Sequence, residues 1–213
     1  MSKVFADIST SLDGYVAGPS PSLEEPLGAG GERLHDWVFG LESWRRPHGL
    51  EGGETNASSA IVDETVARAG AVVMGRRMFS NGEGPWADDP KAHGWWGDDP
   101  PFHAPVFVVT HHARDPLPME GGTTFNFVTD GIESAIEQAR AAAGEKDVQI
   151  AGGANVIQQA LAAGLLDELQ VSVAPMLLGG GTSLFGPGAE ASFELDRVVD
   201  APGVTHLRYR VLR

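Results

Sequence analysis

The chain has 213 residues, 42% of them hydrophobic, so it is long enough to bury a core of its own. Its formal charge of −14, from 15 basic and 29 acidic residues, argues against a general nucleic-acid binder and against attachment to an anionic membrane surface. Cysteine is absent, which excludes disulfides, zinc–thiolate sites, iron–sulfur clusters and thiol nucleophiles.

The N-terminal stretch enters a strand pattern directly, without a secretory h-region, and the chain contains no long apolar run. We therefore expect a soluble cytoplasmic protein. The seven histidines form neither an HExxH motif nor a His-x-His strand pair, so we expect no metal site. P-loop, G-x-G-x-x-G and G-x-S-x-G motifs are absent as well.

Apolar periodicity divides the chain into alternating strands and helices. The expected strands are residues 3–12, 71–74, 106–110, 125–129, 148–151, 166–174, 193–200 and 204–212. The expected helices are residues 32–46, 57–69, 131–143 and 155–163, with a further short helix after Gly75. This order predicts a single α/β domain over residues 1–213, with a mostly parallel sheet, helices on both faces and an antiparallel C-terminal edge.

Capping residues support two of these helices. Ser58 or Ser59 is placed to cap the helix that Gly70 then ends. Asp130, followed by Glu133, is placed for a capping box at the start of a second helix. Residues 80–104 contain no such pattern, and a long irregular loop in a compact domain is typical of a functional lid or a partner surface.

The stretch at residues 148–157 is the most informative in the chain. A short apolar strand runs into Gly152 and Gly153, and a helix follows. Helix N-terminal N–H groups carry partial positive charge, and glycine lets a phosphate approach the backbone. The turn is therefore either a cradle for a cofactor pyrophosphate or a tight connection that needs two glycines for its geometry alone.

Two other strands end in polar residues. One leads into Gly75, Arg76 and Arg77, and the next into Thr110 and His111. Parallel sheets bind ligands beyond the carboxyl ends of their strands, and arginine suits bidentate phosphate contacts. These ends together offer what a dinucleotide with an extra 2′-phosphate needs. The alternatives are a solvated helix start for the arginines and surface positions for the histidines.

Five motifs occur in an order that resembles a known family. They are Ser-Leu-Asp-Gly-Tyr-Val-Ala at 11–17, Val-Val-Met-Gly-Arg-Arg-Met-Phe at 72–79, Ile-Ala-Gly-Gly-Ala at 150–154, Gly-Leu-Leu-Asp-Glu-Leu at 164–169 and Ala-Pro-Met-Leu-Leu-Gly-Gly-Gly at 174–181. Together they resemble the dihydrofolate-reductase-like fold, in the branch of the reductase domain of the bifunctional riboflavin-biosynthesis deaminase/reductase. The resemblance covers nearly the whole chain and implies a three-layer α/β/α fold.

The resemblance also implies an oxidoreductase that uses NADPH, similar to dihydrofolate reductase or to 5-amino-6-(5-phosphoribosylamino)uracil reductase. Its substrate would be a small planar heterocycle of the pterin or aminouracil type. The cofactor-binding residues that it implies are Gly75, Arg76, Arg77, Thr110, His111, Gly152, Gly153, Ala154, Asn155 and Val156. The loop after the first strand, with Asp13, Val16 and Ala17, would close over the nicotinamide. Riboflavin-type members are often homodimers.

The substrate side departs from the family pattern, because residues 19–56 and 80–104 have no counterpart that aligns. We expect Trp37 and Trp86 from these stretches to stack on the substrate, although core packing is an equal alternative for each. Asp63 and Asp36 are the candidate proton donors, against the alternative of a solvated helix face. The deaminase half of the riboflavin protein is absent, because its zinc motif requires cysteine.

Two other functions fit the same residues. A protein of this fold could bind a nucleotide or another small molecule without catalysis. Alternatively, the loop around Trp95 and Trp96 could be a contact surface for another protein. The apolar strand and turn over residues 166–185, or the terminal hairpin, would be an uncovered edge in a monomer, so we expect a homodimer.

Overall fold

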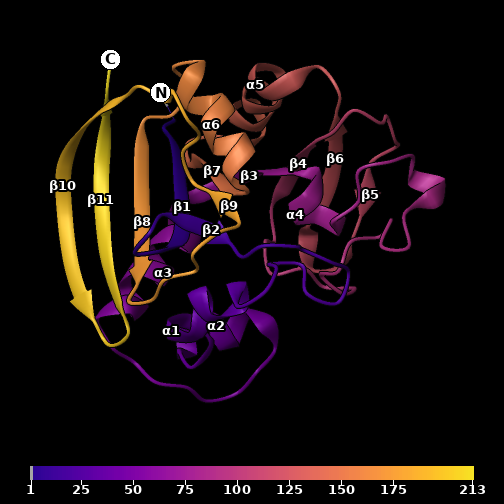
Figure 1. Cartoon of the computed structure of the whole chain (residues 1–213). Helices are drawn as coiled ribbons and strands as arrows, with labels where there is room; N and C mark the ends of the chain where they lie inside the picture. The colour runs from indigo at the N-terminus through magenta and orange to yellow at the C-terminus, as the bar shows by residue number, and fades with distance from the viewer. Residues whose placement is uncertain (1) are drawn as a thin grey trace. The chain divides into compact units, whose positions relative to one another are not determined.

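A computed structural model of the chain describes residues 2–213 (Figure 1). The chain forms two compact units, which are described separately. Unit 1 contains residues 2–6 and 68–166, and unit 2 contains residues 7–67 and 167–213. The prediction of one domain over residues 1–213 stays a prediction. None of the helices among residues 2–213 is long and apolar enough to cross a membrane.

Unit 1 is built on a mostly parallel sheet. Its strands are the first half of β1 (Val4–Ser11), β3 (Ala69–Gly75), β4 (Pro105–Val109), β5 (Leu117–Pro118), β6 (Thr124–Val128) and β7 (Asp147–Gly152). Their order across the sheet is β1-β7-β3-β4-β6-β5, and all neighbours are parallel except β6 and β5. The expected parallel sheet is confirmed, whereas β5 was not predicted because it has only two residues.

Three helices pack on this sheet: α4 (Arg76–Ser80), α5 (Gly131–Ala143) and α6 (Ala154–Ala162). The connection through α4 runs from β3 to β4, and the connection through α5 runs the opposite way across the sheet, from β6 to β7. Parallel crossovers are right-handed, so α4 and α5 lie on opposite faces. Because α6 packs beside α5, it shares that face.

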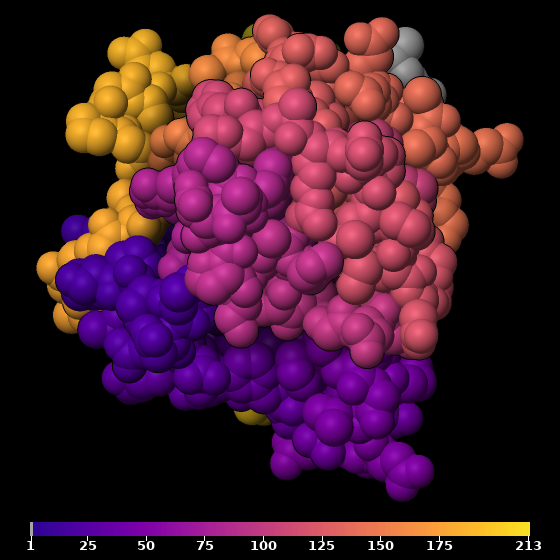
Figure 2. Space-filling model, turned by 90° about the vertical axis from the view of Figure 1, so that its right-hand side faces the viewer, coloured from indigo at the N-terminus to yellow at the C-terminus, as the bar shows by residue number. Residues whose placement is uncertain are grey.

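A large apolar cluster fills the α4 side of the sheet. Its fully buried members are Val72, Met74, Phe79, Val106, Val108 and Phe125. Aromatic side chains from the 80–104 segment and β6 complete it, because Trp86 contacts both Phe79 and Phe127 edge to face. In Figure 2 the chain around residues 75–110, coloured magenta, forms a broad part of the surface shown. The 80–104 segment is therefore packed on the core of unit 1 over part of its length.

Unit 2 combines a sheet that is antiparallel across β10 (Ser192–Ala201), β11 (Val204–Leu212) and β8 (Glu168–Ala174) with short helices. Its other strands are the second half of β1, β2 (Tyr15–Ala17) and β9 (Thr182–Ser183). Its helices are α1 (Asp36–Phe39), α2 (Glu42–Arg45), α3 (Ala57–Arg68) and the 3₁₀ turns Gly31–His35 and Arg46–His48. The order β10-β11-β8-β1 confirms the terminal hairpin and the antiparallel edge, while β2 and β9 form a separate pair.

Polar side chains join α3 to the sheet of unit 2. Glu64 accepts hydrogen bonds from Arg208 at 2.5 Å and Arg197 at 2.7 Å. Asp7 accepts one from Thr65 at 2.8 Å and one from Gln170 at 3.2 Å. The Arg208 hydrogen bond is the main reason that the pKa of Glu64 falls to about 2.

The expectation of one helix over residues 32–46 is wrong. The segment instead consists of a 3₁₀ turn, α1 and α2, interrupted at Gly40 and Leu41. Leu41 is extended and forms a parallel bridge with Glu54, and the Gly40 carbonyl accepts a hydrogen bond from the Glu54 N–H at 2.8 Å. Backbone pairing with a distant segment therefore overrides the helical pattern.

The capping predictions are only partly correct. Asn56 supplies the cap of α3, because its Oδ1 accepts from the Ser58 N–H at 2.8 Å, while Ser59 Oγ accepts from the Asn56 N–H in return. Gly70 lies inside β3 and does not end the helix; a Cβ there would lie 2.5 Å from the Ala143 carbonyl oxygen. At α5, Asp130 makes no side-chain capping hydrogen bond, so the expected box is absent.

Candidate functional site

Three strand ends of unit 1 meet at one edge of its sheet. In the register of β3 with its neighbours, Met74 pairs with Gly152 and Gly75 pairs with Val109. A Cβ added to Gly75 would lie 3.0 Å from Val156 and 3.9 Å from the Gly153 nitrogen. The structure thus brings together the glycines and the start of α6 that the sequence singled out.

The turn into α6 leaves open space for a ligand. Gly153 is the N-cap of the helix and offers no side chain to its first turn. A Cβ added to Gly153 would meet nothing within 4 Å, so the backbone faces open space. Ala154 is buried and Asn155 is exposed in this turn. These residues fit a pyrophosphate cradle, because the N-cap glycine adds no side chain to the space that its added Cβ would enter.

The residues after β4 are arranged around a local turn. Thr110 is buried, and its Oγ1 accepts a hydrogen bond from the His112 N–H at 3.2 Å. His111 between them is exposed to solvent. The structure therefore places Thr110 and His111 at the strand end next to Gly75, with only His111 presenting its side chain to solvent.

The two arginines after β3 have different surroundings. Arg76 is buried, pairs with Asp89, donates to Ser80 Oγ at 3.0 Å and stacks over Trp86 at 3.3 Å from the ring centroid. Arg77 is 68% exposed and pairs with Glu83, which is 64% exposed. The guanidinium of Arg76 is therefore held by the 80–104 segment, whereas that of Arg77 lies at the surface.

Trp86 belongs to the same cluster of unit 1. Its Nε1 donates to the His112 carbonyl at 2.9 Å, and Arg114 lies over its ring at 5.0 Å. Arg114 also donates to the Ala92 carbonyl. The structure thus gives Trp86 a packing role, and its predicted contact with substrate stays a prediction.

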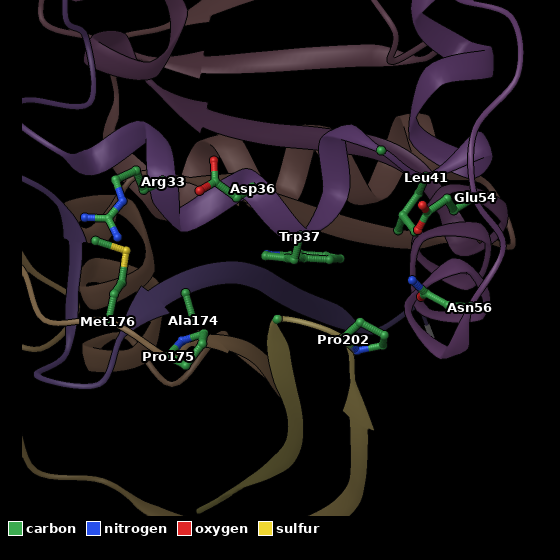
Figure 3. A pocket seen from close by; sticks show the side chains of 12 residues that line it. Arg33, Asp36, Trp37, Leu41, Glu54, Asn56, Ala174, Pro175, Met176 and Pro202 are labelled. Carbon is green, nitrogen blue, oxygen red and sulfur yellow. The ribbon is translucent and has the colours of Figure 1, made fainter.

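Unit 2 contains a pocket of about 400 Å³ (Figure 3). Its lining residues are Arg33, Asp36, Trp37, Gly40, Leu41, Glu54, Asn56, Ala174, Pro175, Met176, Pro202 and Gly203. Two residues that the sequence proposed for the substrate side, Asp36 and Trp37, are therefore neighbours in one cavity. Asp63 is not among them: it lies on the exposed face of α3, 3.5 Å from Arg46.

Contacts with Ser9 and His206 fix the orientation of the Trp37 indole. Its Nε1 donates to Ser9 Oγ on β1 at 3.2 Å, and its ring meets His206 edge to face with 4.9 Å between centroids. His206 is 2% exposed and is hydrogen bonded to Ser58 and to Ser172, each at 2.9 Å. Burial lowers the pKa of His206 to about 4, so the imidazole is neutral at neutral pH.

Asp13 holds the loop that carries two pocket residues. Its carboxylate accepts hydrogen bonds from the N–H groups of Leu178 at 3.1 Å and Gly179 at 2.7 Å. A hydrogen bond from Ser11 is the main reason that the pKa of Asp13 lies below its ordinary value. Val16 is buried and Ala17 is partly buried in β2, which pairs with β9. Asp13 therefore anchors Leu178 and Gly179, and the predicted closure of its loop over the nicotinamide stays a prediction.

Sequence reasoning missed several lining residues, chiefly Arg33, Glu54, Asn56 and Met176. They come from loops and helix ends, and the pairing of Leu41 with Glu54 helps to bring residues 54–56 to the pocket. No periodic pattern marks such positions in the sequence. Residues 2–213 contain no cluster of three or more His, Asp or Glu side chains that could hold a metal ion.

Unit 1 has the parallel sheet of α/β folds, in which ligands bind beyond the carboxyl ends of the strands. The family model of the RibD C-terminal domain matches residues 2–207. The chain therefore belongs to the RibD C-terminal domain family, and it is an oxidoreductase. Comparison with curated proteins finds no match.

Solved structures share this fold. One is a riboflavin biosynthesis protein from Shewanella sp. PV-4. The match has a TM-score of 0.64 and 23% identity, and it covers 100% of both chains. RibD of Acinetobacter baumannii follows with TM-score 0.57 and 19% identity; the match covers all of this chain and 59% of the other. The riboflavin biosynthesis reductase Rib7 of Saccharomyces cerevisia gives TM-score 0.52 and 14% identity, over 100% and 89% of the two chains.

Proposed function

We propose that the chain is a cytoplasmic NADPH-dependent reductase of a planar heterocycle of the aminouracil or pterin type. The observation that carries the proposal is the meeting of Gly75, Gly152 and Gly153 with the start of α6 at one sheet edge, in a chain of the RibD C-terminal domain family. NADPH, when bound, supplies the hydride. The chain supplies binding, orientation and a proton.

On the cofactor side, the turn at Gly153 would receive the pyrophosphate against the N-terminus of α6. Asn155 and Val156 in the first turn of α6, together with Thr110 and His111 at the end of β4, would flank the rest of the nucleotide. Arg77 would contact the adenosine 2′-phosphate, because its exposed guanidinium can exchange Glu83 for a phosphate. Arg76 would support this turn through its contacts with Asp89 and Trp86.

On the substrate side, the pocket of unit 2 would hold the heterocycle. Trp37 offers a flat apolar surface whose orientation is fixed by Ser9 and His206. Asp36 lies next to it in the lining and is exposed, so its carboxyl group is available to a ligand. We assign Asp36, and not Asp63, as the group that delivers the proton to the substrate.

Replacing Gly153 with valine tests the cradle. The new side chain would fill the open space in front of α6, so we expect NADPH binding to fall by at least about a hundredfold while the fold is retained. Binding is measured by titration of nicotinamide fluorescence, and folding by circular dichroism. Normal NADPH affinity in a folded Gly153→Val protein would show that the cofactor binds elsewhere.

The same titration, carried out with NADPH and with NADH on the Arg77→Ala variant, tests which residue sets the preference between the two cofactors. Losing a charge-assisted contact to the 2′-phosphate costs about 1.5–3 kcal/mol, so the preference for NADPH over NADH should shrink by at least tenfold. Arg46→Ala, which removes an equally exposed arginine from unit 2, serves as the charge control. Equal affinity of the wild type for the two cofactors would contradict the assignment.

We also propose that the protein is a homodimer through the apolar face of β10 and β11. Leu195 is 53% exposed and Val198 is 52% exposed on β10. In the hairpin register they lie beside Tyr209 and Leu207, so these side chains share one face of the sheet. Exposed apolar surface on an edge strand invites association, and a second copy would bury it.

The dimer is tested by light scattering at micromolar concentration. We expect twice the chain mass for the wild type and a shift toward the monomer for Val198→Glu, which places a charge on the face. Asp200→Glu changes a residue of the same strand that is already charged, and should leave the mass unchanged. A monomeric wild type would rule out the interface.

A further inference from the structure

The turn that follows β4 has no regular structure to fix its tip. Residues 110–116 lead from β4 to β5 without helix or strand. At the start of the turn, the Thr110 N–H donates to the Val128 carbonyl at 3.0 Å, and Thr110 Oγ1 accepts from the His112 N–H at 3.2 Å. The first residue of the turn therefore holds one backbone group of His112.

The 80–104 segment holds the other backbone group of His112. Trp86 Nε1 donates to the His112 carbonyl at 2.9 Å. Both polar backbone groups of His112 are thus bound to side chains, while His111 beside it is exposed. The place at which His111 meets solvent therefore depends on Thr110 on one side and on Trp86 on the other.

Packing fixes the Trp86 indole that makes this contact. Its ring meets Phe79 and Phe127 edge to face, with 5.9 Å and 4.8 Å between centroids. The Arg76 guanidinium lies over the ring, 3.3 Å from its centroid. With these neighbours around it, the indole has no freedom to follow a moving turn. Its N–H is therefore a donor that is already in place.

Residues 86–92 contact the ends of two neighbouring strands. After β3, Asp89 pairs with Arg76. After β4, the Ala92 carbonyl accepts a hydrogen bond from Arg114, in addition to the indole contact. Because β3 and β4 are paired in parallel, these contacts fix the two strand-end turns relative to each other.

We propose that residues 86–92 hold residues 110–112 in the conformation that binds the adenosine half of the cofactor, with Trp86 as a positioning residue that acts through the His112 carbonyl. This inference rests on the proposed function, in which Arg77 at the neighbouring strand end contacts the adenosine 2′-phosphate. A turn that is ordered before binding loses less conformational entropy when the ligand arrives, so affinity is higher. Trp86 needs no contact with cofactor or substrate for this role.

Trp86→Phe tests the role, because it removes the N–H and keeps an aromatic ring in the cluster. The probe is 2′,5′-ADP, which contains the adenosine half and no nicotinamide, and its affinity is measured by titration calorimetry. We expect about fivefold weaker binding, because one hydrogen bond is lost and the turn must be ordered on binding. NADPH should weaken by the same factor, because the change is confined to the adenosine half.

Trp96→Phe is the matched control from the same segment. Trp96 packs on Phe102 edge to face at 4.9 Å between centroids, and its buried Nε1 has no hydrogen-bond partner among residues 2–213. Replacing it removes an indole N–H that holds no backbone group. Both affinities should therefore remain those of the wild type.

Hydrogen exchange tests the positioning without any ligand. In the cofactor-free protein, the amides of residues 110–114 should exchange about fivefold faster in Trp86→Phe than in the wild type, and at the wild-type rate in Trp96→Phe. A protein with β-(3-benzothienyl)alanine in place of Trp86 keeps the shape of the indole and lacks only the N–H. It should reproduce the effects of Trp86→Phe on exchange and affinity, and it remains a valid test even if the phenylalanine variant does not fold.

The outcomes separate this inference from the proposed function. Unchanged exchange of residues 110–114 after loss of the N–H would overturn the hold on the turn, whether or not the wild type binds NADPH. Faster exchange with unchanged 2′,5′-ADP affinity would overturn the role of Trp86 in cofactor binding, while the reductase assignment would stand. A wild type that binds neither NADPH nor 2′,5′-ADP would overturn the proposed function and this cofactor role together.

Discussion

Arg76→Met should destabilise the protein by about 3–5 kcal/mol, far more than any change at the neighbouring Arg77. The side chains of Arg76 and Asp89 are 8% and 2% exposed. Burial lowers the pKa of Arg76, while Asp89 opposes the shift. Burial raises the pKa of Asp89, and hydrogen bonds from Ser80, the Lys91 N–H and Arg76 outweigh it, so the carboxylate stays ionised. Removing the guanidinium leaves this charge buried and unpaired.

Urea unfolding measures the effect, with Arg77→Met as the control. Arg77 and Glu83 are both more than half exposed, so that variant should lose no more than about 1 kcal/mol. Adding Asp89→Asn to Arg76→Met should recover part of the loss, because the unpaired charge is then removed. Equal destabilisation by Arg76→Met and Arg77→Met would show that the buried pair does not hold the 80–104 segment.

Acid should destabilise the protein through His206, by up to about 3 kcal/mol. The pKa of this imidazole is lowered from 6.5 to about 4, chiefly by burial. Between these pH values the unfolded chain binds a proton that the folded chain does not. The stability contributed by a neutral His206 is therefore complete above about pH 6.5 and falls as the pH approaches 4.

The measurement is the difference in unfolding free energy between the wild type and His206→Gln across this pH range. His35 must be considered too, because burial also lowers its pKa and its contribution has the same sign. Subtracting the variant from the wild type isolates His206.

Glu64 acts below this range, since its pKa is lowered to about 2 and its stabilisation is lost only as the pH falls from 4.5 toward 2. His111→Gln, at an exposed position, should leave the slope unchanged.

Strands and helices with strong periodicity could be predicted from the sequence, and the others could not. Buried parallel strands such as 71–74 and 148–151 are continuous apolar runs, and they occur in β3 and β7 as expected. The segment 32–46 has a helical pattern as well, but its backbone pairs with Glu54 instead. Pairing between distant segments leaves no local signal, which is why β5 and the break at Gly40 were missed.

The part of the candidate site that lies at strand ends could be predicted from the sequence. The part that lies on irregular segments could not. Gly75, Gly152 and Gly153 meet because the carboxyl ends of parallel strands share an edge, which strand order alone implies. Arg33 and Glu54 line the same pocket as Trp37, and no regular pattern in the sequence places them there. For Arg76 the motif predicts a phosphate contact. In the structure its guanidinium forms an ion pair with Asp89.

All the lining residues of the pocket come from residues 33–56, 174–176 and 202–203, which are helix ends, strand ends and loops. Among residues 2–213, strand interiors contribute no side chain to it. Such segments tolerate exchange better than a packed sheet does. A chimaera that grafts residues 31–56 from a relative would transfer the Arg33 and Glu54 positions together, along with the bridge that holds Glu54 in place.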